Sequence, residues 1–230
     1  MFRRRRLLLF ASLLLLLLPA TRALARTVLQ KEGILYRQSV FDKSELETLR
    51  ACMTACSLQP EASHSIAQGR LGAVVSHDNN PLLQLLQDPT NSLTRLVQRQ
   101  YHPDYILAPP ENIPIEVRMY AQPGANMAWH VDDVLYDPPQ LEVVWTLDNT
   151  SNCQTCWKDR STSSTTCLES EPNAVLLLVA GQVEHCVTSL TYGKRTILKC
   201  AYVHKEAVRR SVEQRVPQFG GKKKRNRTKR

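Results

Sequence analysis

The sequence predicts an α+β domain in which helices pack outside a two-sheet jelly roll. Two observations support this class. Helix signals fall in the first half of the chain, up to Tyr101, and short segments with strand periodicity follow Pro109-Pro110. Turns that carry Gly or Pro separate those segments, which is typical of a sandwich or barrel. About 195 residues remain once both termini are set aside, which suits one domain with its own core.

Three helices are expected before Tyr101. Asp42 can cap the first, with Glu45 three residues later as in a capping box. Asn80-Pro81 is a good start for the second, and the third runs from about Ser92 to Tyr101. The first helix buries an apolar stripe whose members share one face: Leu46, Leu49, Met53 and Cys56.

Five extended segments are expected. Two alternate apolar and polar residues, one is a continuous apolar run of the kind covered on both faces, and one is rich in β-branched and aromatic residues. In chain order they are Gly33 to Phe41, Ile113 to Tyr120, Leu141 to Leu147, Ala174 to Ala180 and Thr196 to Val203.

The first 25 residues have the order of a secretory signal peptide. Four arginines, Arg3 to Arg6, precede the apolar run Leu7–Leu18, and Ala23-Leu24-Ala25 supplies a small-residue cleavage site. That run is shorter than the ~20 residues that cross a bilayer, so a signal anchor is the weaker alternative. No later segment is long and apolar enough to span, so a soluble lumenal or secreted product is expected.

The net charge of +9 belongs to the two ends of the chain. The signal segment and residues 222–230 hold 12 of the 30 basic residues, leaving 18 against 21 acidic residues between 26 and 221. That body is a poor match for a nucleic-acid-binding face. The low-complexity tail 222–230 is expected to be disordered, either as a solvated end or as an element that binds acidic partners.

Seven cysteines in a chain that enters the secretory route are expected to pair, with at least one left over. Cys153, Cys156 and Cys167 belong to a polar stretch, Thr150 to Thr166, that we interpret as an inserted surface loop. A disulfide is favoured there over a zinc site, which lacks a fourth ligand. Asn149 and Asn226 begin glycosylation sequons.

Two histidines and an aspartate are the candidate metal ligands. His130-Val131-Asp132 follows a strand and the Pro123-Gly124 turn, and residues i and i+2 of an extended chain project to the same side. His185 follows the apolar run and the Ala180-Gly181 turn, at the edge of a sheet. Two imidazoles and one carboxylate leave three positions open on ferrous iron for a keto acid and dioxygen. A structural zinc site would have four protein ligands.

Arg195 lies ten residues beyond His185, across the Tyr192-Gly193 turn, where a hairpin return would bring its guanidinium toward the metal. Its planar, permanently charged fork suits the far carboxylate of a dicarboxylic keto acid. A single histidine is usually a hydrogen-bonded structural residue, so the metal hypothesis depends on all four residues together.

This pattern resembles the 2-oxoglutarate/Fe(II) dioxygenase superfamily, nearest its prolyl 4-hydroxylase-like branch, over roughly Ile113 to Val203. The resemblance implies a double-stranded β-helix and three cofactor expectations: Fe(II), 2-oxoglutarate as cosubstrate, and ascorbate. It implies iron bound by His130, Asp132 and His185, and 2-oxoglutarate contacted by Arg195 and Tyr120. The residues that carry it, in order, are Tyr120, Gly124, His130-Val131-Asp132, His185, Gly193 and Arg195.

Three positions depart from the family pattern. Ile197 stands where Ser is common two residues after the arginine, Met127 replaces an aromatic before the His-x-Asp, and Tyr202 stands in for a late Trp. These departures bear on the substrate class more than on metal binding.

Several neighbours receive plainer interpretations. Asp133 could compete with Asp132 as a ligand, but alternation turns it away, and the same rule makes Cys186 a buried strand residue facing outward. Arg118 and Glu116 are expected to pair with each other rather than to line the cosubstrate cavity. The remaining histidines are interpreted as structural: His64, His77, His102 and His204.

The predicted function is therefore an oxygenase that consumes O2 and 2-oxoglutarate and hydroxylates a C–H bond, with a prolyl-type peptide or protein substrate as the first expectation. Its expected location is the secretory pathway, either the endoplasmic reticulum or Golgi lumen or outside the cell. Two alternatives stay open: a catalytically silent jelly-roll binding module with the basic tail as a tether, and a disulfide-stabilised lectin-like domain.

Overall fold

The computed structural model describes residues 29–54, 56–62, 65–75 and 80–210. The predicted signal peptide, the basic tail, His64, His77 and Asn226 lie outside these residues. No helix within the described ranges is both long enough and apolar enough to cross a membrane.

After the helical residues 29–32, three helices and fifteen strands follow one another in the described part of the chain. The helices are α2 (Lys43–Thr54), α3 (Pro81–Gln87) and α4 (Ser92–Gln100). The strands are β1 (Ile34–Arg37), β2 (Gln59–Pro60), β3 (Ala67–Gln68), β4 (Arg70–Val74), β5 (Tyr105–Leu107), β6 (Glu116–Tyr120), β7 (Asn126–His130), β8 (Tyr136–Asp137), β9 (Leu141–Asn149), β10 (Thr155–Lys158), β11 (Thr165–Leu168), β12 (Ala174–Val179), β13 (His185–Val187), β14 (Arg195–His204) and β15 (Val208–Arg209).

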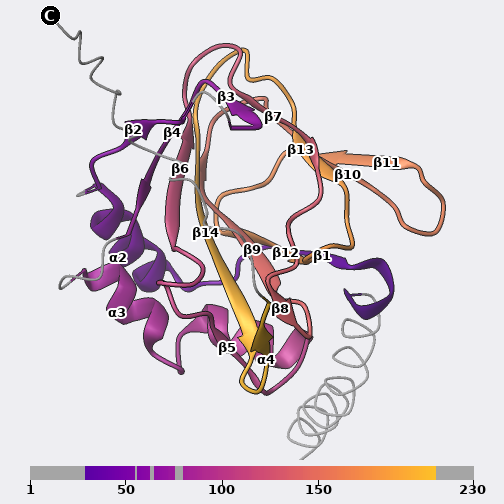
Figure 1. Cartoon of the computed structure of the whole chain (residues 1–230). Helices are drawn as coiled ribbons and strands as arrows, with labels where there is room; N and C mark the ends of the chain where they lie inside the picture. The colour runs from indigo at the N-terminus through magenta and orange to yellow at the C-terminus, as the bar shows by residue number, and fades with distance from the viewer. Residues whose placement is uncertain (1–28, 55, 63–64, 76–79, 211–230) are drawn as a thin grey trace, which may run out of the picture.

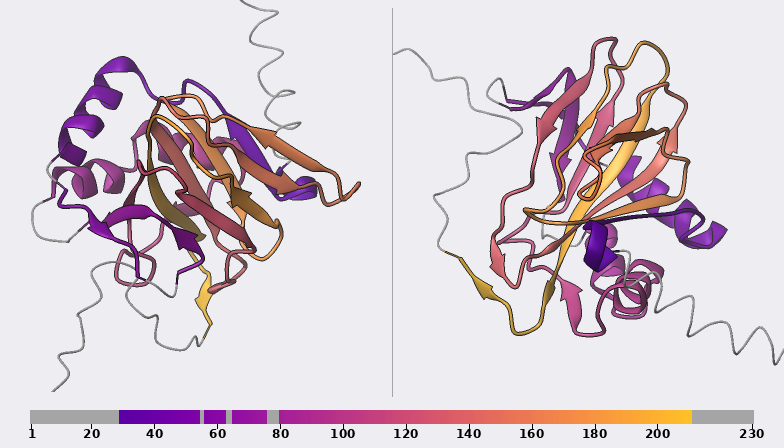
Figure 2. Two further views of the ribbon diagram at one scale, coloured as in Figure 1. Left: turned by 90° about the horizontal axis from the view of Figure 1, so that it is seen from above. Right: turned by 90° about the vertical axis from the view of Figure 1, so that its right-hand side faces the viewer.

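Two antiparallel sheets face each other and make the jelly roll. The larger has eight strands in the order β1-β12-β9-β14-β6-β4-β2, with β5 paired to β14, and the smaller has the order β11-β10-β13-β7-β3. The helices lie together outside the larger sheet, whereas β10 and β11 extend from the other side of the molecule (Figures 1 and 2). The predicted α+β class, a double-stranded β-helix with helices outside, is confirmed.

The helix boundaries follow from local capping. The Asp42 backbone N–H donates to Glu45 Oε2 at 3.3 Å, and the Glu45 N–H donates to Asp42 Oδ1 at 2.8 Å, so the predicted capping box is present. Asn80 caps α3 by accepting from the Leu82 N–H at 2.9 Å. Asn91 caps α4 in the same manner. All three predicted helices are therefore confirmed.

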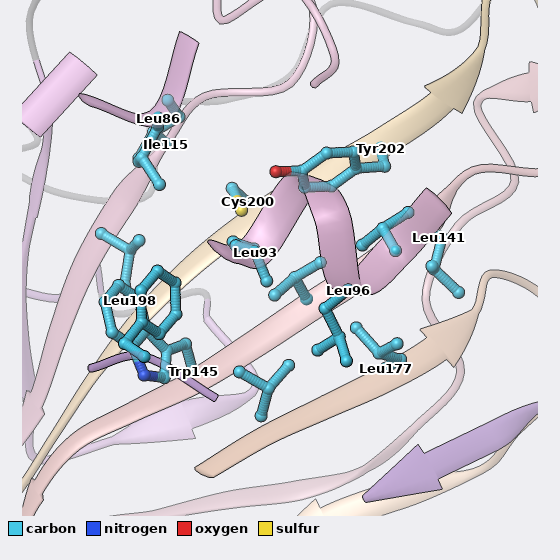
Figure 3. Close-up of a cluster of buried hydrophobic side chains, with 14 of the residues drawn as sticks. Leu86, Leu93, Leu96, Ile115, Leu141, Trp145, Leu177, Leu198, Cys200 and Tyr202 are labelled. Atoms are coloured by element: carbon cyan, nitrogen blue, oxygen red, sulfur yellow. The ribbon is translucent and has the colours of Figure 1, made fainter. Parts of the chain in front are cut away.

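The main core lies between the helices and the larger sheet. Leu93 and Leu96 of α4 belong to the same buried cluster as Leu141 and Leu177 of the strands, and Figure 3 shows this cluster. The Trp145 ring is fully buried there. Strands β9, β12 and β14 therefore bury one face under the helices, and their other face is left to build the space between the two sheets.

The stretch interpreted as an inserted loop, Thr150 to Thr166, is instead largely the hairpin β10–β11. Its hydroxyl side chains resemble a loop in composition, but β-branched threonines suit strands, and β10 also pairs with β13 of the smaller sheet. The favoured disulfide is present between Cys156 and Cys167. The expectation that most cysteines are paired is wrong for the described residues, in which five cysteines are free: Cys52, Cys56, Cys153, Cys186 and Cys200.

Candidate metal and cosubstrate site

The three predicted metal ligands meet between the two sheets. His130 ends β7, Asp132 follows it, and His185 begins β13, whose register places it opposite His130. His130 Nε2 lies 3.9 Å from Asp132 Oδ1, and His185 Nε2 lies 3.6 Å from Asp132 Oδ2. One ligand atom from each residue lies within 4.8 Å of the others. Residues 55 positions apart are thus brought to one point.

Both histidines present the nitrogen that a metal needs. His130 Nδ1 lies 3.0 Å from the Ala128 carbonyl and His185 Nδ1 lies 3.1 Å from the Val183 carbonyl. A carbonyl only accepts, so each Nδ1 carries the proton and donates. Each Nε2 therefore keeps its lone pair and faces Asp132, which is the usual arrangement of metal-binding imidazoles.

The backbone holds the two ligand segments together. The Gly181 N–H donates to the Asp132 carbonyl at 3.0 Å, so the turn before β13 is tied to the segment after β7. Gly181 has a φ of +77°, and a Cβ atom there would lie 2.4 Å from Val134 Cγ2. Glycine is therefore required at this turn, which carries the chain to His185.

Arg195 lies fully buried in the inner part of the same space. Its Nη1 donates to Thr155 Oγ1 at 2.8 Å, and its Nη2 donates to Ser170 Oγ at 3.3 Å. Its Nε has no hydrogen-bond partner, and no carboxylate of a described residue pairs with it. A buried guanidinium held only by neutral hydroxyls needs an anion, because an unpaired charge is costly to bury.

Tyr120 and a second arginine complete that inner space. Arg70 is buried and forms a bidentate ion pair with Glu61, and its Nη1 donates to the Tyr120 hydroxyl at 3.1 Å. The Tyr120 oxygen accepts this bond, so its own proton is free to donate to an anion. The structure thus places Tyr120 and Arg195, from the larger sheet, around the same inner cavity as the candidate metal ligands.

Arg70 was missed in the sequence, and so were two further charged residues of this site, Lys199 and Glu142. Lys199 Nζ lies 3.0 Å from Asp132 Oδ1 and 3.4 Å from Glu142 Oε2. Gln140 Nε2 donates to Glu142 Oε1 at 3.0 Å. Strand parity could have found Lys199, because it lies four residues beyond Arg195 on one face of β14.

Electrostatics leave the ligands ready to bind a cation. Burial lowers the pKa of His130 to about 4, with the neighbouring His185 as a second cause, and burial also lowers the pKa of His185. Burial opposes ionisation of Asp132, but the Lys199 ammonium holds the pKa of this carboxyl below its usual range. At neutral pH both rings are therefore neutral and the carboxylate is charged.

A cleft of about 320 Å³ leads from the ligands to the surface. Glu116 and Arg118 pair with each other, as predicted. They also line the wall of this cleft, so the two roles that were set against each other are both present. Ile66 and Val131 also line the cleft, and both side chains are nearly half exposed. The mouth is thus partly apolar, whereas the floor is charged.

The plainer interpretations fare unevenly. Asp133 is exposed and does not join the ligand cluster, and Cys186 is buried, both as expected. His102 and His204, interpreted as structural histidines, converge on one carboxylate, because both lie beside Asp104. Sequence separation hid this cluster, since 102 positions divide its ends.

The structure also shows where the three residues that depart from the family pattern lie. Ile197 packs in the apolar cluster beside Tyr120, and Met127 accepts a hydrogen bond from Arg70 at its sulfur, so both lie in the inner space. Tyr202 lies on the opposite face of β14, where its hydroxyl meets Thr94 Oγ1 at 2.8 Å in the main core.

No family model and no curated protein matches the sequence. Several solved structures match the fold of this chain. A Pseudomonas putida prolyl-4-hydroxylase matches at 14% identity and a TM-score of 0.58, over 79% of this chain and 97% of that one. A Trichoplax adhaerens prolyl hydroxylase, solved with a hypoxia inducible factor peptide fragment, matches at 12% identity and a TM-score of 0.63, over 85% and 94%.

HygX from Streptomyces hygroscopicus, solved with nickel and 2-oxoglutarate bound, matches at 14% identity and a TM-score of 0.57, over 76% of this chain and 84% of that one. These matches cover most of both chains, although few residues are identical. The protein therefore has the jelly-roll fold of the solved 2-oxoglutarate/Fe(II) oxygenases, prolyl hydroxylases among them.

Proposed function

We propose that this protein is a 2-oxoglutarate- and Fe(II)-dependent oxygenase that hydroxylates a C–H bond. One observation carries the proposal: two imidazole Nε2 atoms, each set by an Nδ1–H bond to a carbonyl, converge with one carboxylate inside this fold. The iron ligands are His130, Asp132 and His185, and the catalytic set includes Arg195.

The residues present fit both the metal and the cosubstrate. Two nitrogens and one oxygen are the donor set of non-haem Fe(II) oxygenases, with three positions left open. Arg195, buried without a carboxylate partner among the described residues, fits the far carboxylate of a dicarboxylic keto acid. Tyr120 donates its hydroxyl proton to the same carboxylate.

The bound iron supplies the chemistry of dioxygen activation, coupled to oxidative decarboxylation of the keto acid. The chain orients and shields that chemistry. Arg195 and Tyr120 would hold the far carboxylate of 2-oxoglutarate, in the same cavity as the residues that would hold the iron. Lys199 acts as a positioning residue: its ammonium holds Asp132 Oδ1, which leaves Oδ2 directed at His185.

A peptide is the substrate class that we favour, with a prolyl residue as the first candidate. The cleft is open at its mouth, and its rim carries the half-exposed apolar side chains Ile66 and Val131, which suit an extended peptide with apolar residues. The Trichoplax relative in fold was solved with a peptide fragment bound. The N-terminal sequence supports a secretory-pathway location.

The test is 2-oxoglutarate turnover measured as succinate release, with Fe(II) and ascorbate present, on the full chain. We expect turnover in the wild type, none in His130→Ala, and a loss of at least 100-fold at low 2-oxoglutarate in Arg195→Ala. Arg99→Ala, on the exposed face of α4, is the matched control and should behave as wild type.

A second measurement separates the enzyme from a silent binding module. Binding of 2-oxoglutarate with Fe(II), without oxygen, should raise the melting temperature of the wild type. Turnover unaffected by both active-site changes, or the absence of both turnover and a thermal shift, would reject the proposal. Mass spectrometry of peptides incubated with the enzyme then tests the prolyl assignment, which a +16 Da product on another residue would overturn.

A further inference from the structure

A second group of metal-binding side chains lies at the far end of β14. His102 and Asp104 belong to the connection between α4 and β5, and His204 is the last residue of β14. Asp104 Oδ2 lies 3.9 Å from His102 Nδ1 and 3.9 Å from His204 Nε2. One atom from each residue lies within 4.8 Å of the others.

The sheet fixes this arrangement. Strand β5 pairs with β14 so that Tyr105 lies opposite His204, which places the preceding Asp104 beside the end of β14. The Lys205 N–H donates to the Asp104 carbonyl at 2.9 Å. The Tyr105 ring packs beside both imidazoles, with centroid distances of 6.3 Å to His102 and 5.8 Å to His204, and the two imidazole centroids are 5.4 Å apart. The three side chains thus project from paired backbone.

The cluster is separate from the site between the sheets. His204 lies five residues beyond Lys199 on the same strand, a separation of roughly 16 Å at the rise of a β-strand. All three side chains are partly exposed, and their solvent access differs from that of the buried His185. The cleft described above has no wall in common with them.

The geometry is close to that of a bound transition-metal ion. Two ligands at about 2.1 Å from a tetrahedral ion lie ~3.4 Å apart, so the two 3.9 Å separations close with small side-chain rotations. Asp104 uses Oδ1 for the ion pair with Lys205 Nζ at 2.9 Å, which leaves Oδ2 for the metal. The Lys205 hydrogen bond also lowers the pKa of Asp104, so the carboxylate is charged at neutral pH.

Both rings must give up a hydrogen bond before they bind a metal. His102 Nδ1, the atom nearest Asp104 Oδ2, accepts a hydrogen bond from the Asp104 N–H at 3.2 Å, so metal binding at this lone pair displaces that bond. His204 Nδ1 accepts from the Glu206 N–H at 3.3 Å, so its proton lies on Nε2. Metal binding at Nε2 moves that proton to Nδ1 through solvent and ends this long bond. The affinity should therefore be lower than that of the buried ligand cluster.

We propose that His102, Asp104 and His204 form a second, open site for a divalent transition-metal ion of the Zn²⁺ class. Two imidazoles and one carboxylate favour Zn²⁺, Cu²⁺ or Ni²⁺ over Mg²⁺ or Ca²⁺, and water completes the coordination. The ion would join the α4–β5 connection to the end of β14. It would stabilise this end of the sheet, because it binds only when both segments are in place.

The test uses Zn²⁺ and Co²⁺ as probes on the full chain. Equilibrium dialysis with Zn²⁺ should show one ion fewer in His204→Gln than in the wild type, and the visible spectrum with Co²⁺ should lose the matching band. Histidines outside the described residues contribute equally to both proteins, so they cancel in this difference. Circular dichroism checks that the variant is folded.

A matched pair of variants sharpens the result. Lys205→Gln removes the competing ammonium and should tighten Zn²⁺ binding at this site about 30-fold, as expected for one charge ~4 Å from a divalent ion at the dielectric constant of water. His130→Ala should lose a different ion and keep this one. An unchanged Zn²⁺ count and Co²⁺ spectrum in folded His204→Gln would overturn the proposal, and would leave the oxygenase proposal untouched.

Discussion

The two faces of the larger sheet differ sharply, and β14 belongs to both. Toward the helices it presents an apolar series, and toward the smaller sheet it presents one buried and one partly buried cation, separated by an isoleucine. The helix-facing residues are Leu198, Cys200 and Tyr202, and the inward-facing residues are Arg195, Ile197 and Lys199.

Neighbouring residues of β14 face opposite sides of the sheet, so residues that stabilise the fold alternate along the strand with residues that line the candidate site. Apolar burial on the helix-facing side stabilises the fold at about 25 cal/mol per Å². Charges buried on the inner side oppose folding unless something pairs with them. A protein tolerates such residues where they serve binding or catalysis, so the inner face is the functional one.

The largest effect should come from Asp132 on the inner side. Asp132→Ala removes the only carboxylate between two neutral imidazoles, so we expect Fe(II) binding to be lost. Anaerobic titration with Fe(II) measures this. Asp133→Ala is the control. The Asp133 carboxylate is exposed and lies outside the ligand cluster, so this variant should bind Fe(II) as the wild type does. Equal Fe(II) affinity in both variants would contradict the ligand assignment.

The helix-facing side should respond to Leu177→Ala. Leu177 is fully buried in the main core, so its truncation should lower the free energy of unfolding by about 2–5 kcal/mol. Urea denaturation measures the loss. Leu85→Ala, at a half-buried position on α3, should lower it less. Because the change lies on the other face, Fe(II) affinity of the folded variant should stay within a few-fold of wild type.

Arg195 gives the sharpest test of the contrast, with an effect on binding of about 100-fold. Arg195→Met removes the fork proposed to hold 2-oxoglutarate, so its dissociation constant should rise by about that factor, or ~2.7 kcal/mol. Stability of the metal-free protein should stay the same or rise, because an unpaired buried charge is replaced by an apolar chain of similar length.

Calorimetry with 2-oxoglutarate and chemical denaturation give these two numbers. Arg99→Met on exposed α4 should change neither. A variant that loses stability but keeps its 2-oxoglutarate affinity would show that Arg195 is a structural residue, and the proposed division between the faces would fail.

The sequence predicted the fold where periodicity and capping act locally. The Asp42–Glu45 box, the Asn80-Pro81 start and the apolar run of β12 are visible within a few residues, and all have the predicted structure. The β10–β11 hairpin was missed, because its hydroxyl-rich composition resembles a loop and its pairing with β13 is not local.

The site divides in the same way. His130, Asp132 and His185 form a spaced pattern of residues with known chemistry, and the fold brings them together. Lys199 and Glu142 were not found, because a charged residue in an alternating strand is usually taken as solvent-facing. In this sheet the polar positions of β9 and β14 face a cleft. The smaller sheet forms the opposite side of that cleft, and the sequence of β9 and β14 alone does not reveal it.

The cross-link between Cys156 and Cys167 has a practical consequence. It closes the hairpin whose inner strand, β10, hydrogen-bonds directly to β13, the strand that begins with His185. Recombinant protein made in a reducing cytoplasm would lack this disulfide, and β13 would then pair with a β10–β11 hairpin that has no covalent cross-link. The choice of expression host therefore belongs to the enzymology of this protein, and periplasmic or eukaryotic secretion is the sound starting point.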